Sequence, residues 1–124
     1  MYRMVNGMLP PSLASLDYRD IEYLKQHPRF ILFGCGSVAA EIVCQLERNG
    51  LRPSYIMVTQ HKGNPPTFAG IRVSTADELG YIEDTPVVVA CSKRLCKEVK
   101  EMLYGIGYEV LIFAKSVKNF SSSE

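Results

Sequence analysis

A glycine-rich turn is the feature of this sequence best suited to chemistry. Gly34 and Gly36 follow a short apolar run, and with Ala39 they have the spacing G-x-G-x-x-A. In such a turn the first glycine permits a tight bend and the second lets backbone approach a diphosphate, while the small third residue lets a helix pack on a strand. With Cys35 and Ser37, they form a candidate phosphate-binding turn. A tight turn that holds no ligand is the alternative.

Polar residues follow the second apolar run, where a dinucleotide site usually has an acidic residue for the ribose hydroxyls. Residues 59–62 read Thr-Gln-His-Lys and contain no acid, which disfavours NAD. Lys62, or His61 when protonated, could instead meet a phosphate, as in NADP binding, and Gln60 could hydrogen-bond a ribose or a sugar. A polar loop exposed to solvent explains these three residues at least as well.

A third group of candidate residues is the run Cys91, Ser92, Lys93 and Arg94. Ser92 is expected to cap a helix over residues 92–105, which places both basic residues in its first turn. A positive charge there is destabilised by the helix dipole by roughly 0.3–1 kcal/mol per residue. Two such residues beside a ligand crevice indicate a bound anion, although basic side chains that extend into water explain their position equally well. Cys91 is also expected near Cys35, which would permit a redox-sensitive pair.

The elements that must position these residues alternate between strand and helix. Continuously apolar runs predict strands buried on both faces, and apolar positions spaced three or four apart predict helices. A capping box of the form Thr-x-x-Glu opens the short helix at residue 75. The expected strands are 30–33, 55–58, 71–73, 86–90 and 108–113, and the expected helices are 17–27, 37–49, 75–79 and 92–105.

This alternation predicts an α/β fold, a Rossmann-like three-layer sandwich around a parallel five-stranded sheet. Right-handed crossovers favour the strand order 3-2-1-4-5. In that order the first and fourth strands are neighbours, so the glycine turn and the Cys91 segment end on the same edge of the sheet. Residues 59–70 are expected to be a loop.

The domain organisation expected from the sequence is simple. Residues 1–16 form an N-terminal arm, residues 17–118 form one domain that includes a helix at 17–27, and residues 119–124 are a polar tail. The apolar residues of the arm could cover a partner surface, which allows a homodimer or a separate catalytic partner. The chain of 124 residues lies within the usual range of one domain.

Composition excludes several functional classes. The net charge of +1 offers no global field for nucleic acid or an anionic membrane, so any anion site must be local. No run approaches the ~18 apolar residues of a membrane helix. The four cysteines have no zinc-like or C-x-x-C spacing, so free thiols in a reducing cytoplasm and no metal are expected.

Residues 29–113 resemble the N-terminal Rossmann-like domain of bacterial sugar acyltransferases and related nucleotide-sugar proteins of surface polysaccharide synthesis. The resemblance rests on the runs 31–37, 70–74, 76–79, 87–90 and 107–110. It implies that Gly34, Gly36, Ser37 and Cys91 lie beside the nucleotide of a UDP-sugar. The chain departs from the family because residues 58–60 lack its frequent aspartate and no hexapeptide repeats follow residue 113.

Three functions remain open from the sequence, and whether the protein is an enzyme stays undecided. The first is a module that binds a nucleotide sugar or a dinucleotide and works with, or regulates, a separate catalytic partner. The second is a small NADP-linked oxidoreductase completed by dimerisation through the arm. The third is a structural or interaction domain with a vestigial nucleotide site. No set of residues with catalytic spacing distinguishes them.

Overall fold

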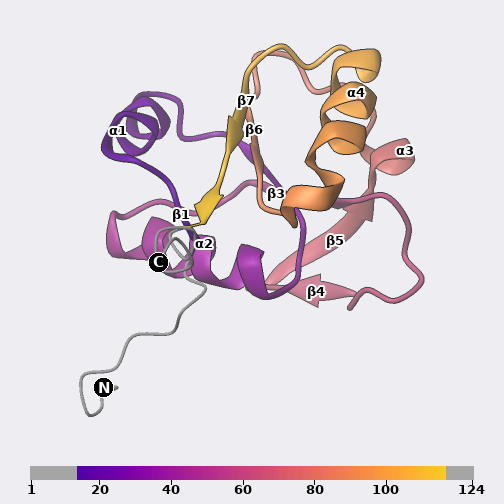
Figure 1. The fold of residues 1–124 in the computed structure, drawn as a ribbon, viewed down its shortest axis with the longest axis horizontal. Coiled ribbons are helices and arrows are strands. Elements are labelled where there is room, and N and C mark those ends of the chain that lie inside the picture. The colour runs from indigo at the N-terminus through magenta and orange to yellow at the C-terminus, as the bar shows by residue number, and fades with distance from the viewer. Residues whose placement is uncertain (1–13, 117–124) are drawn as a thin grey trace, which may run out of the picture.

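The structure is a computed structural model, and residues 14–116 are described. Expectations for residues 1–13 and 117–124, which make up most of the arm and all of the tail, lie outside the described residues. Figure 1 shows the order of the elements along the chain. The elements are β1 Ala14–Ser15, α1 Tyr18–Gln26, β2 Ile31–Phe33, α2 Ser37–Arg48, β3 Tyr55–Val58, β4 Thr67–Phe68, β5 Ile71–Thr75, α3 Ala76–Leu79, β6 Val87–Val89, the 3₁₀ turn Lys93–Leu95, α4 Cys96–Ile106, β7 Leu111–Phe113 and β8 Lys115–Ser116.

The main sheet has six strands in the order β4-β5-β3-β2-β6-β7. The five strands expected from the sequence lie in the predicted order and pair in parallel. The chain leaves β2 towards β3 on one side and later returns to β6 on the other side. The carboxyl ends of β2, β3 and β6 therefore form the switch point at which open α/β sheets bind ligands.

The prediction of a clean five-stranded parallel sheet is wrong. β4 lies within the segment expected to be a loop and pairs antiparallel with β5, with Phe68 opposite Ile71. The sequence signal is weak because β4 has only two residues, follows two prolines and is mostly exposed. Ala69 and Gly70, both with positive φ, form the turn that joins the two strands.

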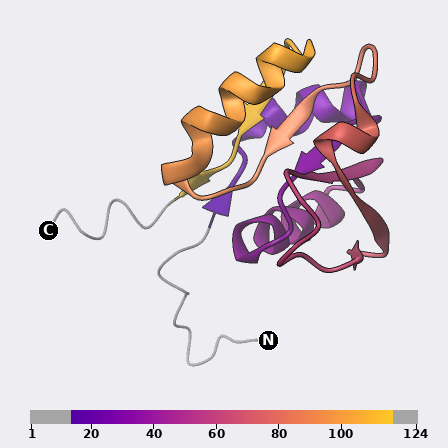
Figure 2. The same ribbon diagram turned by 90° about the vertical axis from the view of Figure 1, so that its right-hand side faces the viewer.

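Helices cover both faces of the sheet, and Figure 2 shows α4 and α2 on opposite sides of it. Successive strand residues point to opposite faces, so Leu32 packs with α1 and α2 while Ile31 and Phe33 pack with α3 and α4. Both faces of the central strands are thus buried. This explains why these strands are continuously apolar, and the three-layer α/β arrangement follows from it.

The helix ends agree well with the local sequence signals. Asp17 caps α1 by accepting a hydrogen bond from the Asp20 N–H at 3.0 Å, and the helix stops before Pro28. Thr75 and Glu78 form both hydrogen bonds of the predicted capping box. Within α1, Ile21 and Leu24 are buried, whereas Tyr18 is 76% exposed and is not part of the packed face.

The end of the expected arm is attached to the domain. β1 pairs antiparallel with β8 in a separate two-stranded sheet. The Leu16 N–H donates to the side-chain oxygen of Gln45 at 2.7 Å, and the Gln45 amide donates back to the Leu16 carbonyl at 2.9 Å. Lys115 and Asp17 form an ion pair at 3.1 Å. Residues 14–17 and 115–116 thus lie together beside α2.

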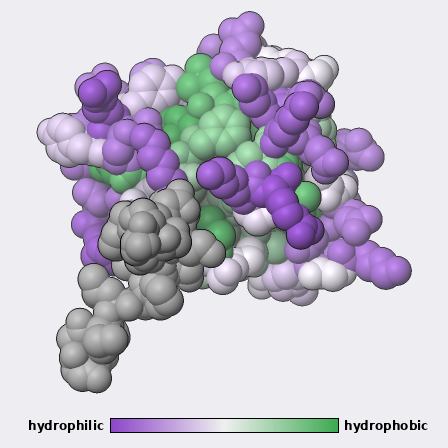
Figure 3. Space-filling view, viewed as in Figure 1, coloured by the Kyte–Doolittle hydropathy of each residue, from purple (hydrophilic) through white to green (hydrophobic). Residues whose placement is uncertain are grey.

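One face of the molecule exposes apolar surface. Figure 3 shows it between α1 and α4, over the region where β6 and β7 run in Figure 1. Val110, directly before β7, is 42% exposed. In the part of the chain that the structure describes, no helix combines the length and apolar character needed to cross a membrane.

Candidate functional site

The glycine turn lies at the switch point, and its two glycines differ in what the fold requires of them. Gly34 has φ +119°, and a Cβ added there would lie 2.4 Å from the carbonyl oxygen of Ala90. Only glycine fits this approach of the turn to the end of β6. Ala39, the third small residue of the motif, is fully buried beside Gly34. Its small side chain lets the start of α2 pack closely against the sheet.

Gly36 is under no such constraint. It caps α2 with φ −99°, and a Cβ added there would have no heavy atom within 4 Å. Both Gly36 and Ser37 are exposed. Among the described residues no side chain caps α2, so the N–H groups of its first turn face the space beside Gly36. The turn is open where a phosphate would approach.

The loop after β3 folds against this turn through Asn64, a residue that the sequence analysis did not single out. The Cys35 thiol donates to the Asn64 side-chain oxygen at 3.1 Å, and the Asn64 amide donates to the Gln60 carbonyl at 2.7 Å. Burial raises the pKa of the Cys35 thiol. The only signal for Asn64 was its place in a loop that starts from the switch point.

The two candidate ligand-binding residues of that loop, Gln60 and Lys62, flank His61, which is bound to Glu78. Gln60 and Lys62 have exposed side chains. His61 Nε2 lies 3.0 and 3.1 Å from the two carboxylate oxygens of Glu78, so it donates to that carboxylate. The Thr75 N–H and then His61 lower the pKa of Glu78. His61 therefore ties the loop to α3.

The structure alters the expectations for the segment after β6. Ser92 makes no side-chain capping bond, because residues 93–95 form a 3₁₀ turn closed by the Leu95 N–H on the Ser92 carbonyl at 3.0 Å. The α-helix begins at Cys96, not at residue 92. Lys93 and Arg94 are exposed in the 3₁₀ turn rather than in the first turn of α4, so the expected opposition between their charges and the α-helix dipole is not present in this form.

The two cysteines expected side by side have different neighbours. Cys35 packs with the cluster on the α2 face of the sheet and Cys91 with the cluster on the α4 face. Cys91 Sγ lies 4.0 Å from the sulfur of Cys96. Burial, followed by the neighbouring Cys96, raises the pKa of Cys91 to about 12. All four cysteines are free thiols.

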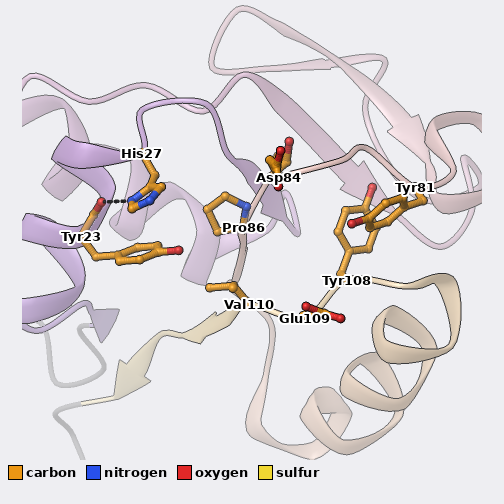
Figure 4. Close-up of a pocket in the computed structure, with 9 residues that line it drawn as sticks. Tyr23, His27, Tyr81, Asp84, Pro86, Tyr108, Glu109 and Val110 are labelled. Atoms are coloured by element: carbon orange, nitrogen blue, oxygen red, sulfur yellow. Dashed lines mark hydrogen bonds between the residues drawn. The ribbon is translucent and has the colours of Figure 1, made fainter.

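A pocket of about 320 Å³ lies at the opposite, amino edge of the sheet (Figure 4). Pro86 and Val110, which directly precede β6 and β7, lie between two pairs of rings in this view. The Tyr23 and His27 rings stack at 4.2 Å, and the Tyr81 and Tyr108 rings lie 5.1 Å apart. The lining residues are Tyr23, His27, Tyr81, Asp84, Thr85, Pro86, Tyr108, Glu109 and Val110.

The charges of this pocket are unsuited to a phosphate. Its charged lining residues are Asp84 and Glu109, and it includes no lysine or arginine. His27 Nδ1 donates to the Tyr23 carbonyl at 3.0 Å, which leaves Nε2 as an acceptor when the ring is neutral. Tyr108 donates to the Gly80 carbonyl at 2.6 Å and accepts from the Ile82 N–H, and burial raises its pKa. No sequence pattern predicted this pocket.

Comparison with protein-family models, with curated proteins and with solved structures finds no match for this chain. Among residues 14–116, no group of three or more His, Cys, Asp or Glu side chains is arranged to hold a metal ion.

Proposed function

We propose that this protein is a cytoplasmic nucleotide-binding module with a Rossmann-like fold that holds the phosphates of a nucleotide sugar or a dinucleotide at the glycine turn. It acts with, or regulates, a separate catalytic partner in bacterial surface polysaccharide or sugar metabolism. The assignment to that metabolism rests on the resemblance of residues 29–113 to nucleotide-sugar proteins.

The observation that carries the proposal is the difference between Gly34 and Gly36. Packing against Ala90 accounts for Gly34, but no contact accounts for Gly36, which stands before free N–H groups at the start of α2. A phosphate accepts such N–H groups and is favoured by the helix dipole. Exposed Lys62, Lys93 and Arg94 follow strands that end at the same edge and could supply counter-charge.

A panel of ligands tests the proposal through thermal stability. UDP, UDP-sugars, NAD, NADP and coenzyme A are added separately at millimolar concentration. A ligand with Kd ~10 μM then stabilises the fold by about 2.7 kcal/mol, which raises the melting temperature of a domain of this size by roughly 10 °C or more. Absence of a shift with all of them contradicts the proposal and favours a structural or interaction domain.

Two substitutions at Gly36 locate the ligand. Aspartate and asparagine are both good N-caps, so both variants should fold as stably as the wild type. In Gly36→Asp the carboxylate occupies the first-turn N–H groups and repels phosphate, so affinity for the stabilising nucleotide should fall at least tenfold. Gly36→Asn matches it in size without the charge and should weaken binding less. Wild-type affinity in Gly36→Asp would place the ligand elsewhere.

The basic residues provide an independent test. Replacing Lys93 and Arg94 with alanine removes two exposed charges. Stability should be unchanged and nucleotide affinity reduced, with a weaker dependence on salt concentration. Unchanged affinity would remove these two residues from the site.

The amino-edge pocket favours a second candidate function, the binding of an organic cation. Tyrosine rings and two carboxylates attract amines and guanidinium groups and repel phosphates. Agmatine and spermidine therefore belong in the same panel. Stabilisation by these amines that is lost in Glu109→Gln, with no response to nucleotides, would support this second function over the first.

A further inference from the structure

Two thiols face each other where β6 gives way to α4. Cys91 and Cys96 lie at the two ends of the 3₁₀ turn, with their sulfur atoms 4.0 Å apart. Cys96 Sγ also donates to the Ser92 carbonyl at 3.5 Å, which holds its side chain over the turn. A disulfide has an S–S length of about 2.05 Å, so the sulfurs must approach by roughly 2 Å, a movement within reach of two side-chain torsions in a short turn.

We propose that Cys91 and Cys96 form a modification site that closes to an intramolecular disulfide when it meets a disulfide-class oxidant such as oxidised glutathione. The inference rests on the geometry of the two thiols and is independent of nucleotide binding. It replaces the pair Cys35 and Cys91 that the sequence indicated.

The reaction proceeds by two exchanges. The Cys96 thiolate attacks oxidised glutathione, forming a mixed disulfide and releasing one glutathione thiolate, which takes up a proton. Cys91 then gives its proton to solvent and attacks the Cys96 sulfur, which releases the second glutathione. Two protein thiols lose two electrons together, and one oxidised glutathione is reduced to two glutathione molecules.

The order of the two exchanges follows from the environment of Cys91. Its burial and its neighbour keep it protonated near neutral pH. Exchange therefore begins at Cys96, and the slow step is ring closure by Cys91. Closure should accelerate as the pH rises from 7 to 9, because the reactive species is the thiolate.

The other two cysteines provide internal controls. Cys35 is engaged by Asn64 and belongs to the cluster on the opposite face of the sheet. Cys44 is exposed on α2, which covers that same face. Either can react alone with glutathione, but neither lies within the cluster that holds Cys91. A glutathione adduct is thus the expected product at these two positions.

Mass spectrometry of the full chain tests the site. After treatment with oxidised glutathione and alkylation of free thiols, the protein should carry one internal disulfide, while Cys35 and Cys44 should carry glutathione or the alkylating group. Lys93 and Arg94 lie between the two cysteines, so trypsin should give peptides 73–93 and 95–97 joined to each other without reduction. Predominant linkage of any other pair, or no 91–96 linkage, would overturn the proposal.

Two serine variants check the order of exchange, and a third serves as their control. Cys91→Ser should accumulate a glutathione adduct at Cys96, because the second exchange cannot follow. Cys96→Ser should leave Cys91 largely free, while Cys44→Ser should form the 91–96 linkage like the wild type. Circular dichroism verifies that each variant is folded. If Cys91 in the Cys96→Ser variant formed as much glutathione adduct as Cys96 does in the Cys91→Ser variant, the assigned order would be contradicted.

A comparison with the unfolded chain separates structure from mere closeness in sequence. The equilibrium between dithiol and disulfide in glutathione buffers gives the effective concentration of one thiol at the other. If the fold holds the pair as described, this value should be at least tenfold higher in the native protein than in concentrated urea. An equal or lower native value would overturn the proposal even if the disulfide forms.

Discussion

At the scale of single residues, the two glycines of the turn have different surroundings, because a Cβ would meet the Ala90 carbonyl at Gly34 and nothing within 4 Å at Gly36. The sequence shows spacing, and spacing alone cannot reveal which carbonyl a missing side chain would meet. Gly34 is fixed by contact with Ala90, a residue 56 positions later that the strand order brings alongside. Gly36 has no such contact, and our proposal assigns it to a ligand at the start of α2.

Gly34→Ala should destabilise the protein strongly. The new Cβ would meet the Ala90 oxygen at 2.4 Å, and alanine is strained at φ +119°. Backbone strain of this kind costs about 1–3 kcal/mol, and displacement of the end of β6 adds to it, so a loss of roughly 2–4 kcal/mol is expected. Urea unfolding measures the loss.

The matched control is Gly36→Ala. Its φ is −99° and its surroundings are open, so only the weaker capping ability of alanine counts, about 1 kcal/mol or less. Equal losses in the two variants would show that the contact between the turn and β6 is not formed as described.

The cysteines and Ser92 show the limit of local reasoning at this scale. A serine followed by a helical pattern is a good capping signal, yet the 3₁₀ turn of residues 93–95 delays the α-helix to Cys96. That shift of one turn brings Cys96 over the Ser92 carbonyl and beside Cys91. The sequence contained both cysteines but could not reveal this geometry.

At the scale of elements, prediction succeeded where local chemistry decides the outcome. The Thr75 capping box and the Asp17 cap are each made within four residues, so both could be predicted from spacing alone. β4 and the β1–β8 pair were missed because two-residue strands have no periodicity. Their pairing depends on what lies opposite in space.

The capping box gives a prediction about acid. The pKa of Glu78 is lowered from 4.5 in the folded protein, so the stabilisation by its carboxylate is present above about pH 4.5 and is lost as the pH falls through the lower folded value. In Glu78→Gln the amide oxygen can still accept from the Thr75 N–H, but it does not titrate. The stability difference between wild type and variant should therefore shrink as the pH falls from 6 to 3.

Urea unfolding at several pH values measures this difference. Asp77→Asn, an acid of the same helical turn that is not part of the capping box, is the control and should keep the wild-type dependence on pH. If the difference for Glu78→Gln stays constant down to pH 3, then the bonds from Thr75 and His61 do not hold the carboxylate in its charged form.

At the scale of the whole molecule, the strand order followed from alternation and handedness, two rules that need no knowledge of individual contacts. The closure of the chain did not follow from them. β1 and β8 are about a hundred residues apart in sequence, and no periodic sequence pattern predicts that such distant segments pair. The side chain of Gln45 completes this closure by bonding both polar groups of the Leu16 backbone.

Removing the Gln45 side chain should therefore loosen the closure while the parallel sheet remains. Gln45→Ala leaves the Leu16 N–H and carbonyl without their partner beside a leucine side chain that is 3% exposed. Each unsatisfied buried group costs about 1–3 kcal/mol unless water reaches it, so the segment should partly detach. Hydrogen exchange at the Leu16 amide should then accelerate by tenfold or more, with little change in the amides of β2 and β6.

Glu47→Ala, an exposed substitution on the same helix, should leave all of these rates unchanged. If exchange accelerated equally throughout the sheet, the β1–β8 pair would be part of one cooperative unit with the core, and not a closure added to a sheet that is stable without it.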